Sequence, residues 1–149
     1  HNAYLQSLGL ETLTLRLDLA CANTLEIAEF LQKSKRVKAV NYPGLKKSPY
    51  FEIAKKQFGQ KAGAVLTFDL ASKEECFKFL NGLKIIRRAT NLQDNRTLVL
   101  HPASTIFCEY NDQLKSEMGV RETMIRLSVG IEDAADLISD IEQSLEGLK

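Results

Sequence analysis

Hydrophobic and polar positions along the chain follow two periods, and the change from one to the other predicts where helices and strands lie. Apolar residues recur at helical spacings over residues 5–31 with no intervening proline, which predicts one long helix. Any break in it is expected at Gly9, because glycine costs about 1 kcal/mol relative to alanine in a helix interior. The remaining pattern predicts strands at 37–42, 64–70, 85–88, 96–100 and 124–129, and helices at 50–58, 73–80, 111–118 and 132–145.

Cap and turn residues support two of these helices. Ser72 with Glu75 three residues later is a capping box at the start of the helix at 73–80. Ser48, followed by a proline, opens the preceding helix, and Gly59 ends it.

The order of the elements predicts the fold class. The strands at 85–88 and 96–100 flank a polar loop, which we judge too short for a parallel crossover, so we expect this pair to be antiparallel. The chain as a whole predicts an α+β fold: a mostly antiparallel sheet of four or five strands, covered by helices on one face, with the long first helix running along it. No repeat or internal linker divides the chain, so we expect a single domain.

Composition narrows the class of protein without indicating a function. The 149 residues include 20 Lys and Arg against 19 Asp and Glu, a net charge of +1, with 44% apolar and 26% charged residues. These values are typical of a soluble globular protein. The near-neutral charge argues against nucleic acid or an anionic membrane as partner, and no apolar run approaches the roughly 20 residues that span a bilayer. Three separated cysteines are typical of reduced thiols in a cytoplasmic protein.

Most residues with chemical potential have an ordinary structural interpretation. His101, at a strand end before a proline, is expected to form structural hydrogen bonds rather than act as a base. The acidic residues around the start of the last helix are expected to form a solvated first turn that complements the helix dipole, rather than a metal site. These acidic residues are Glu132, Asp133, Asp136 and Asp140.

Arg126 is the strongest candidate for ligand chemistry. In the alternating strand at 124–129, Ile125, Leu127 and Val129 share one face, so Arg126 points to the other. A planar guanidinium on a rigid strand suits bidentate binding of a carboxylate. Periodicity alone nevertheless favours the alternative interpretation, in which the arginine pairs with a neighbouring helix.

The sequence around Arg126 resembles a known family. IRLSVGIED at 125–133 resembles the C-terminal signature of the Cys/Met-metabolism family of pyridoxal-phosphate (PLP) enzymes. That family includes methionine γ-lyase, cystathionine γ-synthase, cystathionine γ-lyase and O-acetylhomoserine sulfhydrylase. HPAS at 101–104 and VNYPGL at 40–45 resemble two further segments of it, and the resemblance extends over nearly the whole chain in register.

The resemblance implies the domain organisation and the site. It implies that residues 4–149 are the small C-terminal domain of a longer fold-type-I enzyme, and we interpret residues 1–3 as a cloning scar. In the family, the arginine of this signature binds the α-carboxylate of the amino-acid substrate, so the role falls to Arg126. A second carboxylate contact falls to Asn91. Some apolar residues of the first helix are then expected to form an interface rather than core.

The resemblance also implies what this chain lacks. PLP would be held by a large domain absent from this chain, and no catalytic residue, cofactor-binding residue or metal is expected here. None of Lys46, Lys47, Lys55 and Lys56 lies in a context resembling the lysine that binds the cofactor in this family. The family further implies a homotetramer for the full-length enzyme.

The loop at 90–95 decides between subfamilies. Its Asn-x-x-Asp-x-Arg-Thr pattern, beginning at Asn91, is more similar to O-acetylhomoserine sulfhydrylases than to the γ-lyases, although Gln93 stands where the family usually has glycine. We therefore expect an enzyme that replaces the acyl group of O-acetylhomoserine by sulfide or a thiol. Methionine γ-lyase and the two cystathionine enzymes are the alternatives within the family. A stand-alone α+β module that binds a small molecule is the alternative of another class.

Overall fold

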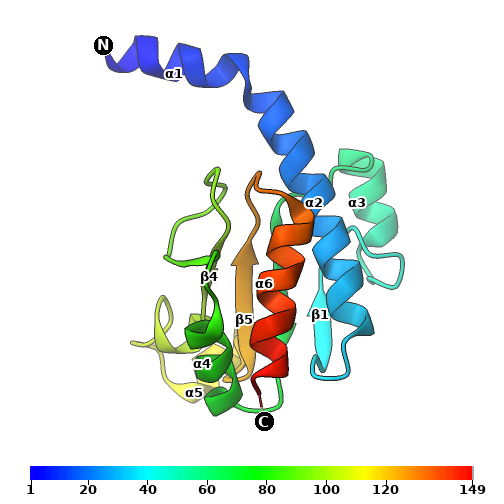
Figure 1. Ribbon diagram of the computed structural model, residues 1–149, viewed down its shortest axis with the longest axis vertical. Coiled ribbons are helices and arrows are strands. Elements are labelled where there is room, and N and C mark those ends of the chain that lie inside the picture. Colours follow the sequence, from blue (N-terminus) through cyan, green and yellow to red (C-terminus); the bar gives the residue numbers. More distant parts are fainter. Residues whose placement is uncertain (149) are drawn as a thin grey trace.

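The computed structural model describes residues 1–148, and its elements follow the predicted order (Figure 1). The five predicted strands and the four later helices all form, with ends within two residues of the predicted bounds. In chain order the elements are α1 (Asn2–Glu11), α2 (Leu13–Lys33), β1 (Ala39–Asn41), α3 (Phe51–Phe58), β2 (Val65–Asp69), α4 (Lys73–Gly82), β3 (Arg87–Arg88), β4 (Leu98–Leu100), the 3-10 helix η1 (Pro102–Ser104), α5 (Asp112–Glu117), β5 (Met124–Ser128) and α6 (Ala134–Glu146).

The five strands form one mixed sheet in the order β1-β2-β5-β4-β3. The pairs β1–β2, β2–β5 and β4–β5 are antiparallel, which confirms a mostly antiparallel sheet. The pair β3–β4 is parallel, so the antiparallel pairing predicted for it is wrong. The reason is the length of the strands. Because β3 and β4 have only two and three residues, the connection has to return over roughly 10 Å, which an irregular loop can do without a crossover helix.

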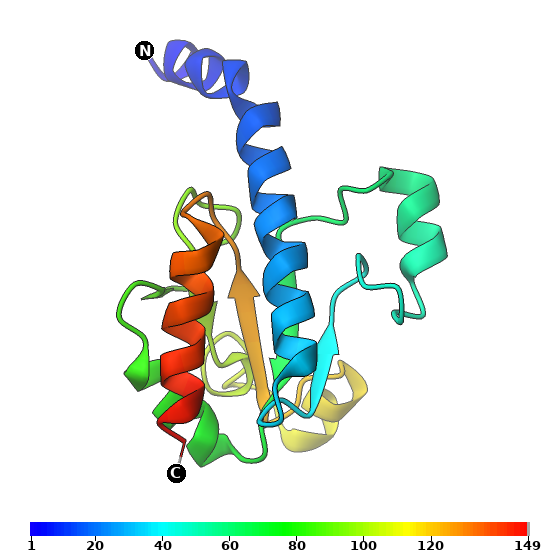
Figure 2. The same ribbon diagram turned by 45° about the vertical axis from the view of Figure 1, so that its right-hand side comes forward.

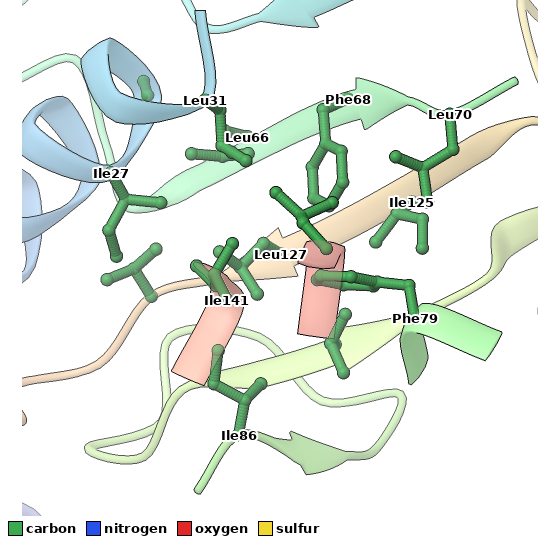
Figure 3. Close-up of a cluster of buried hydrophobic side chains, with 14 of the residues drawn as sticks. Ile27, Leu31, Leu66, Phe68, Leu70, Phe79, Ile86, Ile125, Leu127 and Ile141 are labelled. Carbon is green, nitrogen blue, oxygen red and sulfur yellow. The ribbon is translucent and has the colours of Figure 1, made fainter. Parts of the chain in front are cut away.

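Helices α2, α4 and α6 cover one face of the sheet, as predicted (Figures 1 and 2). Leu66 and Phe68 of β2 and Ile125 and Leu127 of β5 are at most 1% exposed on this face. Burying each such side chain contributes about 1.5–3 kcal/mol. The helices contribute Ile27, Leu31, Phe79 and Ile141 to the same cluster (Figure 3).

The opposite face of the sheet is not covered by α2, α4 and α6. Its residues are the alternate positions of the same strands, among them Thr67 and Arg126. The segment containing η1 and α5 lies behind the sheet in Figure 1. Leu100 and Met124 are buried on this face. The described chain contains no helix of the length and hydrophobicity that a membrane crossing requires.

The first predicted helix is in fact two helices, because Thr12 breaks it. We expected any break at Gly9, and that prediction is wrong. The Arg16 guanidinium donates through Nη2 to the Gly9 carbonyl oxygen at 2.5 Å and through Nε to Thr12 Oγ1 at 3.3 Å. Gly9 therefore stays helical with its carbonyl capped, while the β-branched Thr12 takes a non-helical conformation at φ −109° and ψ 7°.

Helix α1 has no buried residue and projects away from the body (Figures 1 and 2). Its apolar residues and those of the first part of α2 are exposed, which agrees with the expectation that they are not core. The exposed set is Tyr4, Leu5, Leu8, Leu10, Leu13, Leu15, Leu17 and Leu19.

Two of the predicted helix-end residues, Ser72 and Gly59, act as expected. Ser48 does not cap α3, which begins at Phe51 with Tyr50 as its N-cap; the Ser48 hydroxyl instead accepts from the Tyr50 N–H in the preceding turn, at 3.2 Å. Ser72 Oγ accepts a hydrogen bond from the Glu75 N–H at 3.2 Å, and the Glu75 carboxylate accepts from the Ala71 N–H at 3.1 Å. The capping box thus forms with its second bond one residue earlier than the usual pattern. Gly59 ends α3 at φ +66°, a conformation that favours glycine.

Candidate functional site

Arg126 occupies the middle of β5, which is the central strand of the sheet. Its register partners are Thr67 on β2 and Leu100 on β4, so neighbouring strands fix its backbone on both sides. Its side chain points to the face that α2, α4 and α6 leave uncovered. The sequence analysis predicted this orientation, and the strand pairing confirms it.

The Arg126 guanidinium is only partly satisfied by the chain. Nη2 donates to the carbonyl oxygens of Thr90 at 3.0 Å and Asn91 at 3.2 Å. Nε is buried and has no hydrogen-bond partner among the described residues. Burial lowers the pKa of the Arg126 guanidinium, although an arginine stays charged at neutral pH. The contacts of Arg126 are thus with loop carbonyls and not with a neighbouring helix.

Thr67 contributes a second unpaired polar atom next to Arg126. The Val129 N–H donates to the Ala64 carbonyl oxygen at 2.8 Å, so alternate pairs along β2 and β5 are hydrogen bonded and Thr67–Arg126 falls between two of them. The Cα atoms of such a pair lie about 4.5 Å apart, and their side chains are close. Thr67 Oγ1 is buried without a partner in the described chain. Unpaired N–H and O–H groups therefore lie on adjacent side chains.

The loop between β3 and β4 brings the two predicted site residues together. The Asn91 carbonyl accepts from Arg126, and the Asn91 side chain is exposed. Two residues later, the Gln93 N–H donates to Ser128 Oγ at 2.9 Å. Gln93 has φ +52°, a left-handed conformation that favours glycine, which explains why glycine suits this position in the family that the sequence resembles.

The acidic residues at the start of α6 are not all solvated, so that expectation is only partly right. Asp133 caps α6 by accepting from Ala135 N, and Asp136 is exposed. Asp140, however, is only 4% exposed, and its carboxylate accepts from three consecutive backbone N–H groups at 84–86 at 2.8–3.0 Å. Glu132 accepts from Thr97 N at 2.6 Å and Thr97 Oγ1 at 2.7 Å. Both carboxylates therefore accept hydrogen bonds from backbone N–H groups of segments that are distant in sequence.

His101 is a structural residue, as predicted. It is 1% exposed, and its ring nitrogens lie 2.8 Å from Ser104 Oγ and 2.8 Å from the Glu122 carbonyl oxygen. Both ring nitrogens are therefore occupied by the fold. Within residues 1–148, no group of three or more His, Cys, Asp or Glu side chains is arranged to hold a metal ion.

The side chains of residues 1–148 do not form a PLP site. The cofactor requires a lysine held in the site to bind it covalently. No lysine among residues 1–148 is buried. Lys73 and Lys115 are half-buried, and both form ion pairs with Glu122, at 2.7 and 3.6 Å. We therefore derive no chemical step through PLP from this chain.

Sequence reasoning missed three residues around Arg126: Thr67, Ser128 and Glu132. One signal was available for Ser128, because it follows Arg126 by two residues in the same strand and so faces the same side. Glu132 lies in the bend beyond the strand, where alternation no longer applies. Thr67 carries no such signal, since its proximity depends on the register between β2 and β5.

The fold and the site define an α+β domain that presents an incompletely paired arginine on the less covered face of its sheet. Comparison with known proteins identifies the family: residues 1–146 match the model of the Cys/Met metabolism PLP-dependent enzymes. The chain belongs to this family. The match explains the resemblances found at 40–45, 101–104 and 125–133.

Individual relatives have two related activities. The chain is 40% identical over 147 residues to L-methionine gamma-lyase of Treponema denticola, covering 98% of this chain and 36% of that protein. It is 42% identical over 144 residues to O-acetyl-L-homoserine sulfhydrylase 1 of Thermus thermophilus, covering 96% of this chain and 34% of that protein. A solved structure of O-acetylhomoserine sulfhydrylase from Wolinella succinogenes superposes with a TM-score of 0.86 at 48% identity, over 97% of this chain and 38% of that one. The chain thus spans little more than a third of these relatives.

Proposed function

We propose that this chain is the substrate-binding part of a PLP-dependent O-acetyl-L-homoserine sulfhydrylase, in which Arg126 binds the α-carboxylate of the amino-acid substrate. One observation carries the proposal: the Arg126 guanidinium is held by two loop carbonyls through Nη2, while its buried Nε has no partner in the described chain. A buried N–H without an acceptor is costly, and a carboxylate is the acceptor that suits a guanidinium best. The central strand supplies the rigidity that orientation requires.

Asn91 is the second residue of the proposed carboxylate site. Its carbonyl oxygen already contacts Arg126, so its exposed side chain leaves the loop close to the guanidinium. An amide N–H is a suitable donor to the same carboxylate. The chain would therefore bind and orient the substrate, and the chemistry would take place on groups supplied elsewhere in the protein.

We further propose that PLP, the lysine that binds it and the large domain lie outside this chain. Two observations support this: no lysine within residues 1–148 is buried, and the chain covers 34–38% of the length of these three relatives. When bound, the cofactor stabilises the negative charge that develops on the substrate carbon during γ-replacement. The homotetramer implied by the family and the cytoplasmic location indicated by the three separated cysteines remain part of this proposal.

The similarity to sulfhydrylases favours O-acetylhomoserine as the substrate. The superposed Wolinella succinogenes protein is 48% identical, and the loop pattern that begins at Asn91 points to the same subfamily. The 40% identity to a methionine gamma-lyase supports methionine as the alternative substrate, and the cystathionine enzymes share the same carboxylate chemistry. Membership of an enzyme family argues against the stand-alone binding module.

The test uses the full-length protein that contains this chain, loaded with PLP. We expect it to convert O-acetylhomoserine and sulfide to homocysteine faster than it releases methanethiol from methionine. The reverse order of rates would make methionine γ-lyase the better assignment, and no turnover of either would refute the proposed substrate class.

A substitution tests the role of Arg126 separately. Arg126→Ala is expected to weaken substrate binding by about 2–5 kcal/mol, seen as a large rise in KM, because the carboxylate loses its charged partner. The matched control is Arg88→Ala, since Arg88 lies on edge strand β3 and donates to Asn81 Oδ1 at 2.6 Å. An unchanged KM in the Arg126 variant would refute the carboxylate role.

A further inference from the structure

The loop that carries Asn91 is held by residues at even spacings along β5 and its continuation. Arg126 donates to the Thr90 and Asn91 carbonyl oxygens, Ser128 accepts from the Gln93 N–H at 2.9 Å, and the Glu132 carboxylate binds residue 97. Arg126 and Ser128 face the loop together because they stand two residues apart in β5, whereas Glu132 reaches the loop from the bend that follows the strand. The loop is thus attached at its beginning and middle to the strand that carries the arginine, and at its end to Glu132.

The middle attachment is the one that fixes Asn91. Within the described chain, the hydrogen bonds that residues 90–93 make to other segments come from Arg126 and Ser128. Gln93 has φ +52°, and among residues 1–148 it is the non-glycine residue with positive φ. A side chain at this φ is strained, so the conformation needs a contact that holds it. The hydrogen bond to Ser128 is that contact.

We propose that Ser128 is a positioning residue for the substrate carboxylate, an inference that rests on the proposed function. Ser128 is 1% exposed, so its hydroxyl does not face solvent or a ligand. It acts through the loop: by accepting from the Gln93 N–H, it holds the backbone two residues after Asn91. This keeps the Asn91 peptide, whose carbonyl oxygen contacts Arg126, in the place from which the Asn91 side chain extends. Without the hydroxyl, the loop loses its middle attachment while Arg126 keeps its charge.

The inference predicts a specific kinetic signature. In the full-length PLP-loaded protein, Ser128→Ala should raise KM for the amino-acid substrate about tenfold and leave kcat within about twofold, because orientation of the carboxylate is lost and the reacting groups are not touched. Asn91→Ala should raise KM by a similar factor. The double variant should be no worse than either single one, since both remove the same contact.

Two further variants separate positioning from general stability. Ser144→Ala is the matched control: Ser144 is also buried, and its Oγ donates to the Phe79 carbonyl oxygen at 2.6 Å, far from the loop in sequence and on α6. We expect its KM to be unchanged. Gln93→Gly in the Ser128→Ala background should bring KM back to within about threefold of the parent, because glycine adopts the left-handed conformation without help.

A measurement without catalysis keeps the inference testable if Ser128→Ala folds poorly. Gln93→Val changes an exposed loop residue and leaves the core intact, yet a β-branched side chain is disfavoured at positive φ, so the loop should leave Ser128. Ser128→Ala and Gln93→Val should each speed amide hydrogen exchange at residue 93 by about tenfold or more, whereas Ser144→Ala should not.

The outcomes distinguish this inference from the function on which it rests. If Arg126→Ala raises KM but Ser128→Ala and Gln93→Val do not, the positioning role is refuted and the carboxylate site stands. Multiplicative effects of Ser128→Ala and Asn91→Ala, or an equal rise of KM in Ser144→Ala, would also refute it. If Arg126→Ala itself leaves KM unchanged, the proposed function fails and the positioning role fails with it.

Discussion

The two faces of the central strands are formed by alternate residues of the same backbone, yet they differ in the polarity and the hydrogen bonding of their buried atoms. On the helix-covered face, Leu127 of β5 is fully buried among other hydrophobic side chains. One residue earlier, Arg126 points the other way with a buried Nε that nothing in the described chain satisfies. Thr67, across the strand pair, has an unpaired hydroxyl on that same face. Alternation along a strand thus places the hydrophobic residues that stabilise the fold on one face and the residues with unpaired hydrogen-bonding atoms on the other.

The largest expected effect is on the helix-covered face. Leu127→Ala should destabilise this chain by about 2–5 kcal/mol, because it leaves a cavity in the core. Urea unfolding measures the loss. Leu15→Ala is the matched control: it makes the same change at a residue that is 71% exposed, and we expect a shift below about 0.5 kcal/mol. Equal losses for both variants would contradict the assignment of the core to this face.

The next effect has the opposite sign and tests the other face. Thr67→Val should stabilise the chain by about 1 kcal/mol, because it replaces a buried unpaired hydroxyl by a methyl group of similar size. Thr97→Val is the control, since Thr97 Oγ1 donates to Glu132 and accepts from the Gly130 N–H, so its loss should destabilise by about 1–3 kcal/mol. Thermal unfolding of both variants gives the signs. Destabilisation by Thr67→Val would mean that its hydroxyl is satisfied.

Gln93→Gly should give a smaller stabilisation, of about 0.5 kcal/mol. Relief of the left-handed strain contributes about 1–2 kcal/mol, and the greater freedom of glycine in the unfolded chain offsets much of it. Gln93→Ala keeps the strain and should leave the free energy of unfolding unchanged within error. If both variants changed stability equally, backbone strain at φ +52° would not be the cause.

The smallest effect on stability is expected at the residue most important for binding. Arg126→Met should change the free energy of unfolding by less than about 0.5 kcal/mol, because the gain from removing an unpaired N–H offsets the loss of two contacts to loop carbonyls that water can replace. Arg121→Met is the contrast: Arg121 binds both oxygens of the buried Asp69, at 2.9 and 2.6 Å. Its loss should cost roughly 1–3 kcal/mol in the same unfolding experiment.

Local patterns predicted most of the elements, because caps and alternation act over a few residues. Ser72 with Glu75, Gly59 and the strand around Arg126 are examples in which neighbours in sequence are also partners in space. The parallel pairing of β3 with β4 was not predictable in this way, since strands this short impose no minimum length on the loop between them. The break at Thr12 depends on Arg16, whose side chain bridges back to an earlier turn.

The site was predictable only in part, for a related reason. Alternation indicated the direction of Arg126, and the resemblance to a family indicated its role and that of Asn91. The contact between Ser128 and Gln93 joins residues 35 positions apart, and Asp140 reaches backbone groups more than 50 residues away. No local pattern encodes such pairs. Glu132 and Asp140 were for this reason interpreted as solvated, although Asp140 is buried and Glu132 is partly buried against Thr97.

The break at Thr12 has a mechanical consequence. Helix α1 has ten residues and is about 15 Å long, so a rotation of roughly 10° about Thr12 would move its far end by about 2.6 Å. The Arg16 guanidinium spans the break: it donates to the Gly9 carbonyl oxygen and to Thr12 Oγ1. It also lies 3.5 Å from Asn95 Oδ1, near the end of the loop that carries Asn91. A rotation of α1 about Thr12 would therefore also disturb the contact between Arg16 and the loop that carries Asn91.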